Sequence, residues 1–117
     1  MARTPDILYI GQPAATNTSL YTVPASTQTT ITAIHVVNTN SATKYFSLHI
    51  KQSGDTVADD VAIAHTIKLA GTSSSSGGGT WTWEIPLPLM TVGDIINGIQ
   101  ETATACTVTI IGFTEAV

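Results

Sequence analysis

The sequence predicts an all-β fold: an antiparallel β-sandwich of about eight strands with a jelly-roll-like arrangement. The first observation is composition, because threonine occurs about twenty times, isoleucine and valine are frequent, and β-branched residues favour strands. The second is pattern, because short apolar or alternating runs recur along the chain with turn-forming residues between them. The third is that no stretch repeats with the helical period and no alternation of strands and helices is found, which argues against an α/β fold.

The composition predicts a single folded domain whose surface is partly covered by neighbours. The chain has 117 residues, of which 43% are hydrophobic and 10% charged, and its mean hydropathy is +0.25. Disordered chains have the opposite composition. Because an isolated small domain usually carries more charge for solubility, the low charge predicts a homo-oligomer or a larger assembly.

The charges argue against a nucleic-acid partner, and the short apolar runs argue against a membrane partner. The net charge is −4, and the four cations, Arg3, Lys44, Lys51 and Lys68, are scattered along the chain. A nucleic-acid-binding protein needs clustered cations to displace counterions from phosphate, so we expect no nucleic acid as a partner. No apolar run approaches the ~20 residues of a membrane-spanning helix, so we expect no membrane partner.

The start of the chain and its cysteine indicate a protein made in a reducing compartment. The segment MARTPDILYIGQP lacks the continuous apolar stretch of a secretory signal. Cys106 is the only cysteine, so no disulfide can form within the chain. We expect it to be a small buried residue on a strand rather than a catalytic nucleophile.

Residues 1–17 are expected to form either an extended arm or the first strand of the sandwich, with the rest of the sandwich in residues 18–117. An apolar patch between two prolines is the candidate contact with a partner or with another subunit. This patch consists of Ile7, Leu8, Tyr9 and Ile10. The sequence leaves both alternatives open.

Four further strands are expected before residue 70. Residues 20–23 form a strand that Pro24 ends, and residues 29–38 are apolar on both faces, which is typical of a central strand. Residues 45–51 and 62–69 alternate, which places every second side chain on one face. The faces expected to be apolar carry Phe46, Leu48 and Ile50 in the first of these, and Ile63, His65, Ile67 and Leu69 in the second.

The second half of the chain begins with a low-complexity loop of serine and glycine, residues 70–80. Trp81, Trp83 and Ile85 then lie on one face of a strand. A strand over residues 94–100 is favoured over a hairpin turn at Asn97-Gly98, because the final strand needs a partner of similar length. That final strand runs from residue 106 to residue 113, and Gly112 is expected to mark its end.

No residue set predicts a metal or cofactor site. His35, His49 and His65 fall on three different strands without a second ligand at zinc-like spacing. Asp55 and its neighbours Asp59 and Asp60 share one loop, but they lack the spacing of a calcium loop. We therefore expect no metal and no cofactor.

No residue set predicts catalysis either. The triple glycine at residues 77–79 precedes neither a Lys-Ser/Thr pair nor a helix, and no Gly-x-Ser-x-Gly motif occurs. Trp81 and Trp83 could form a sugar-stacking platform beside Glu84, but two tryptophans on one strand face more often anchor a sandwich core. We expect the protein not to be an enzyme.

The order of several short segments resembles that of small structural proteins of tailed bacteriophages. Leu-Tyr-Thr-Val-Pro precedes a threonine-rich strand that ends in Asn-Thr, and a Phe-x-Leu strand follows. The later pieces are Thr80-Trp81, Pro88-Leu89, Gly93-Asp94-Ile95-Ile96 and the strand of residues 107–113. The resemblance covers residues 20–117, and it departs from the family pattern at residues 71–80, where serines and glycines are inserted.

The resemblance implies a virion component that acts by contact. It suggests a capsid decoration or cement protein, a homotrimer that binds the major capsid protein on the outside of a phage head and stabilises it. Such a protein would be assembled in the host cytoplasm and located on the capsid surface. The alternatives are a receptor- or glycan-binding module of a tail fibre or adhesin, which would use the tryptophans and the Ser/Gly loop, and a neck or tail adaptor subunit.

Overall fold

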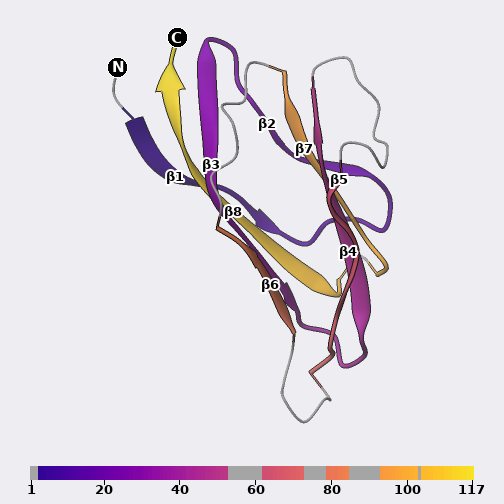
Figure 1. Cartoon of the computed structure of the whole chain (residues 1–117). Helices are drawn as coiled ribbons and strands as arrows, with labels where there is room; N and C mark the ends of the chain where they lie inside the picture. The colour runs from indigo at the N-terminus through magenta and orange to yellow at the C-terminus, as the bar shows by residue number, and fades with distance from the viewer. Residues whose placement is uncertain (1–2, 53–61, 73–78, 85–92, 103) are drawn as a thin grey trace.

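Eight antiparallel strands form two four-stranded sheets (Figure 1). The computed structural model describes residues 3–52, 62–72, 79–84, 93–102 and 104–117, and these contain no helix. The strands are β1 (Arg3–Gly11), β2 (Thr18–Thr22), β3 (Thr27–Asn38), β4 (Lys44–Lys51), β5 (Ala62–Leu69), β6 (Thr80–Trp83), β7 (Ile95–Gln100) and β8 (Cys106–Ala116). The predicted fold class is confirmed.

The strand order is that of a jelly roll. The first sheet has the order β1-β8-β3-β6 and the second sheet has the order β2-β7-β4-β5. Every chain connection except the one from β4 to β5 therefore passes from one sheet to the other. This is the eight-stranded arrangement of two interleaved Greek keys, in which the core lies between the sheets.

Side chains from both sheets meet in this core. One inward row of the first sheet runs across all four strands through Tyr9, Ile110, Ile34 and Trp83. On the second sheet Phe46, with Leu48 and Ile96, is almost completely buried. The predicted alternation of residues 45–51 is thus confirmed on its apolar face.

The two tryptophans belong to this core. The ring of Trp81 meets that of Phe46 edge to face, at 5.5 Å between centroids and 65° between planes. Trp81 lies 6.2 Å from Trp83, and both are half-buried against the core. The core interpretation of the tryptophans is confirmed, whereas Ile85 lies outside the described residues.

Residues 3–11 form the first strand rather than a detached arm. They pair with β8 from Arg3 opposite Glu115 to Gly11 opposite Val108. The register shifts at Leu8, which forms a β-bulge. Residues 12–17 then connect β1 to β2.

The predictions for the second alternating segment, residues 62–69, and for the final strand required corrections. In β5 the predicted alternation breaks near Thr66, where φ is 49° and the pairing with β4 shifts. Because of this shift, Ala64 packs against the core together with Ile67 and Leu69. The side chains of residues 63 and 65 lie outside the described part. Strand β8 continues past Gly112 to Ala116.

Two glycines within strands, Gly98 and Gly112, lie where a neighbour comes too close for a side chain. A Cβ on Gly98 would lie 2.8 Å from Leu20 Cδ1, and a Cβ on Gly112 would collide with the backbone oxygen of Thr30. Gly112 therefore permits close strand packing rather than ending a strand. The strand favoured over a turn at Asn97-Gly98 is confirmed as β7.

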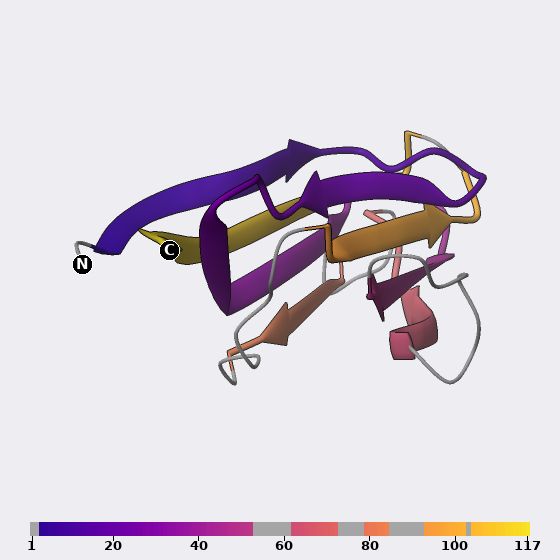
Figure 2. The same ribbon diagram turned by 90° about the horizontal axis from the view of Figure 1, so that it is seen from above.

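The first sheet is longer than the second. Its strands β1, β3 and β8 have 9, 12 and 11 residues, whereas the strands of the second sheet have 5 to 8. Figure 2 shows the two chain ends projecting together beyond the second sheet. The molecule is accordingly elongated, with extents of 47 × 28 × 20 Å.

Candidate functional site

The apolar patch singled out in the sequence is divided between two faces of β1. Ile7 lies opposite Ile111 and Ile10 opposite Thr109, and both isoleucines point away from the core, with 56% and 65% of their surface exposed. Leu8 and Tyr9 pack against the core. Burial raises the pKa of the Tyr9 hydroxyl. Only half of the patch is therefore available for contact.

These isoleucines belong to a broad uncharged surface, the outer face of the first sheet. One outward row runs from Ile10 through Thr109 and His35 to Thr82, across all four strands. Within this row, a hydrogen bond joins Thr82 Oγ1 to His35 Nδ1 at 3.4 Å. The neighbouring outward positions are Thr30, Ala33, Val37, Thr80, Thr107, Ile111 and Phe113.

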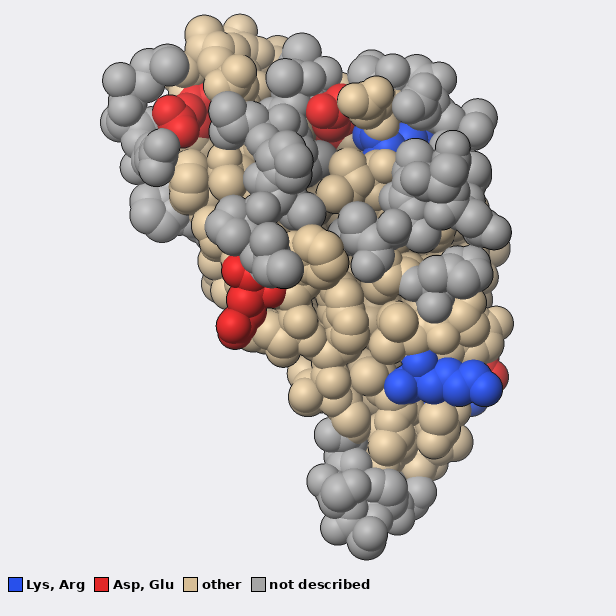
Figure 3. All heavy atoms as spheres, viewed as in Figure 1, with Lys and Arg blue, Asp and Glu red and all other residues tan. Residues whose placement is uncertain are grey.

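Threonine and isoleucine dominate this face. On the part of it formed by residues 107–113 of β8 and the strand positions beside them, His35 is the single ionisable side chain. Glu115 lies at the far end of the same strand. Figure 3 shows one side of the molecule, on which the described charged side chains are few. A face of this composition can be covered by another protein at little electrostatic cost, since no charge loses its water.

The outer face of the second sheet differs. Lys51 and Lys68 lie on it, and between them Ser47, His49 and Asn97 are buried although their strand positions point away from the core. The Ser47 hydroxyl accepts a hydrogen bond from the backbone N–H of Thr66 at 2.8 Å. This face is therefore more polar than the outer face of the first sheet.

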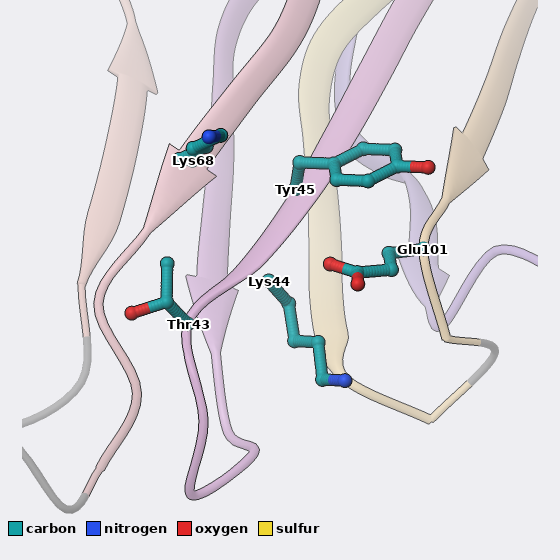
Figure 4. A pocket seen from close by; sticks show the side chains of 5 residues that line it. All are labelled: Thr43, Lys44, Tyr45, Lys68 and Glu101. Carbon is teal, nitrogen blue, oxygen red and sulfur yellow. The ribbon is translucent and has the colours of Figure 1, made fainter.

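A shallow depression of about 290 Å³ lies at one end of the sandwich (Figure 4). It is lined by Thr43, Lys44, Tyr45, Lys68 and Glu101, which come from the start of β4, the end of β5 and the residue after β7. Figure 4 shows the carboxylate of Glu101 directed between Tyr45 and Lys44. Two ammonium groups, one carboxylate and an exposed phenol ring can hold a small polar group, but they provide no nucleophile activated by a base.

A buried side-chain amide shapes one side of this depression. Asn38 is fully buried, and its Nδ2 donates to the carbonyl oxygens of Ala42 at 3.0 Å, Leu69 at 2.9 Å and Ala70 at 3.2 Å. Its Oδ1 accepts from the N–H of Asn40 at 2.9 Å. Because Ala42 and Leu69 are next to lining residues, Asn38 positions both lysine-bearing strand ends.

A second buried amide holds the other side. Gln100 Nε2 donates to the carbonyl oxygens of Pro13 at 2.6 Å and Cys106 at 3.3 Å, and its Oε1 accepts from the N–H of Cys106 at 2.6 Å. The same side chain thus joins the β1–β2 connection to the β7–β8 turn. It also fixes the adjacent Glu101, whose N–H donates to the Tyr45 carbonyl at 3.0 Å.

Sequence reasoning did not identify Asn38 and Gln100, although a signal was present. Asn38 continues the inward series of Ile34 and Val36, and Gln100 continues that of Ile96 and Gly98. A polar side chain at an inward strand position must find hydrogen-bond partners when buried. Both residues could therefore have been assigned to structural hydrogen bonds.

The two described histidine side chains lie on opposite outer faces of the sandwich. His35 lies on the outer face of the first sheet and His49 on that of the second, whereas the side chain of His65 lies outside the described part. Among the described residues, no group of three or more His, Cys, Asp or Glu side chains could hold a metal ion. The loop with Asp55, Asp59 and Asp60 lies outside the described residues, as do residues 73–78 of the Ser/Gly loop.

Cys106 is completely buried at the start of β8. Burial raises the pKa of its thiol, and the nearby carboxylate of Glu101 raises it further. The thiol is therefore protonated at neutral pH and shielded from reagents, which confirms its assignment as a small buried residue on a strand.

The fold and its surfaces define an eight-stranded jelly-roll domain whose two outer faces differ in polarity. No family model matches the chain, and no curated protein matches it. Within the described residues no helix is long and apolar enough to cross a membrane.

Proposed function

We propose that the protein is a structural virion protein that binds the outer surface of a phage head, as a decoration or cement protein, and stabilises the shell as a homotrimer. The observation that carries the proposal is the outer face of the first sheet, where a row from Ile10 through Thr109 and His35 to Thr82 crosses four strands without a charged carboxylate or ammonium group. Such a face is suited to permanent contact with another protein.

The remaining features support contact rather than catalysis. The depression at the end of the sandwich carries charges but no activated nucleophile, and the tryptophans that could have stacked on a sugar are turned into the core. Jelly rolls occur both in viral shells and in lectins, so the fold alone decides neither function. The uncharged face favours the structural role.

The proposed mechanism is multivalent attachment to the major capsid protein. Each subunit of a trimer would bring one uncharged face to the shell, so that three modest contacts act together. Expansion or rupture of the shell would then have to break several contacts at once. This explains how a small domain with little surface charge could stabilise a large particle.

The number of copies per particle tests this function. Quantitative mass spectrometry of purified particles should find hundreds of copies of a protein that covers a symmetric shell, whereas about a dozen or fewer would fit a neck, tail or fibre position and would exclude decoration.

A pair of variants tests the face. Thr109→Lys places a charge in the middle of the outer face of the first sheet, and Ser19→Lys places the same charge on the exposed side of β2 in the second sheet. In co-sedimentation with heads assembled without the protein, Thr109→Lys should bind at least about tenfold more weakly, since a buried unpaired charge costs several kcal/mol. Ser19→Lys should bind like the parent. Equal binding by all three proteins would show that the outer face of the first sheet does not contact the phage head.

A further inference from the structure

Among the described residues the two sheets have four edge strands, and three of these carry features that discourage pairing with another chain. Strand β6 is only four residues long. Strand β5 has two register shifts, a positive φ at Thr66 and the exposed Lys68. Strand β2 has five residues and a register shift between Ser19 and Tyr21. Short length, bulges and lysine are the usual protections of an edge.

Strand β1 also has a bulge, at Leu8, and Arg3, Pro5 and Asp6 near its start, but the second half of its edge is the least protected of the four. The strand is nine residues long, and among the described strands it pairs with β8 alone (Figure 2). From residue 7 to residue 11 it contains neither a charged residue nor a proline. Ile7 and Ile10 are more exposed than any other large hydrophobic residue within the described strands. A long apolar edge of this kind is a site for adding another strand.

The bulge makes this edge self-complementary. In a regular strand, residues 7 and 10 would point to opposite faces, but the extra residue at Leu8 brings Ile7 and Ile10 to the same outer face. If two copies of β1 lie antiparallel about a two-fold axis between Leu8 and Tyr9, Ile7 of each copy faces Ile10 of the other. Because both copies carry the same bulge, the spacing between the two isoleucines matches.

We infer that β1 pairs with β1 of a second copy of this chain, antiparallel and in this register. The two first sheets then form one continuous eight-stranded sheet. Pairing satisfies the free main-chain groups of both edges and buries four isoleucine side chains against one another. The inference goes beyond the proposed function and does not depend on it.

The mass of the protein in solution tests the pairing. Light scattering after size exclusion, over about 1 to 100 μM, should give an even multiple of the 12.2 kDa chain. Ile10→Lys places like charges next to the axis and should halve this mass. The matched control is Val37→Lys, an exposed apolar residue on the same outer face but on the interior strand β3, which should keep the parental mass.

The outcomes separate this inference from the proposed function. If the parent is a hexamer and Ile10→Lys is a trimer, the result supports both the strand pairing and the proposed trimer, because the two-fold contact would then join two trimers. A dimer that becomes a monomer supports the pairing and argues against the trimer. A parent that is a monomer or a trimer, or a mass unchanged by Ile10→Lys, overturns the pairing. Far-ultraviolet circular dichroism of each variant confirms that it is folded.

Cross-linking tests the register. Cysteines at residues 7 and 10 face each other across the proposed axis. Because the bulge places Ile7 and Ile10 two ladder positions apart, residue 7 lies about 7 Å along the strand and one strand spacing across from its own copy, which is about 8 Å and too far for a disulfide. A mixture of Ile7→Cys and Ile10→Cys proteins should therefore form a covalent dimer on mild oxidation, and neither protein alone should do so. Cys106 is buried and does not compete. A dimer formed by either variant alone, or none in the mixture, would contradict the register.

Discussion

Replacing Asn38 with aspartate tests whether a buried amide holds the loops around the depression. The substitution preserves shape but removes both N–H groups that point to the carbonyl oxygens of Ala42, Leu69 and Ala70. The new carboxylate would face three oxygens at a position that is completely buried. The only favourable contact left is that with the N–H of Asn40.

The size of the effect follows from these contacts. Each lost hydrogen bond costs about 1 kcal/mol, and more where the abandoned carbonyl is buried, as that of Leu69 is. An unpaired charge at a buried position adds several kcal/mol. We therefore expect Asn38→Asp to lower the free energy of unfolding by roughly 4 kcal/mol, out of the roughly 5–15 kcal/mol typical of a small domain.

The same chemical change two residues later provides the control. Asn40 uses its Oδ1 to accept from the exposed N–H of Ala42, and aspartate keeps such an oxygen. Asn40→Asp should therefore change the free energy of unfolding by less than about 0.5 kcal/mol. Urea titrations followed by tryptophan fluorescence report the change, since Trp81 and Trp83 lie against the core. Equal effects of the two substitutions would refute the role assigned to the Asn38 amide.

Other substitutions and conditions give further predictions. Gly112→Ala should lower the free energy of unfolding by about 3 kcal/mol or more, because the new methyl group meets the rigid backbone at Thr30. Gly98→Ala should lower it by only about 1–2 kcal/mol, because the new methyl group meets a movable methyl of the Leu20 side chain. Thermal unfolding of the two variants compares these effects. Burial, with the nearby Glu101 in second place, raises the pKa of the Cys106 thiol, so the folded state holds this proton more tightly than the unfolded state. The stabilisation of the folded state by this tightly held proton is complete below about pH 8.5, where the thiol of the unfolded chain ionises. It is lost as the pH rises through the higher pKa of the folded thiol. Urea midpoints should therefore fall at alkaline pH by less in Cys106→Ala than in the parent. A thiol reagent should label Cys106 in urea but not in the folded protein; rapid labelling of the folded protein would show that the thiol is accessible.

Much of the fold could be predicted from local sequence because strand formation depends on local properties. The alternation of Phe46, Leu48 and Ile50 indicates the inner face of β4 without knowledge of any partner strand. Errors arose where a neighbouring strand overrides the local pattern. Gly112 signals a strand end in the sequence, yet it lies within β8 because the adjacent backbone of Thr30 leaves no room for a side chain.

The candidate surfaces were less predictable than the strands. The sequence singled out four residues, from Ile7 to Ile10, as one contact patch, but the bulge at Leu8 leaves only Ile7 and Ile10 exposed. A bulge depends on the pairing of β1 with β8, which are separated by almost the whole chain. The uncharged face likewise became visible only when β1, β8, β3 and β6 were placed side by side.

The sequence by itself determined that this protein is an all-β domain of about eight strands, since β-branched composition and period-two alternation act over a few residues. It also determined a low charge, which predicts a covered surface. Only the tertiary structure decided the jelly-roll order, the inward direction of Trp81 and Trp83, and the open edge of β1. The physical reason is that the order of strands is set by which distant pairings bury both apolar faces together, and no short stretch of chain contains that information.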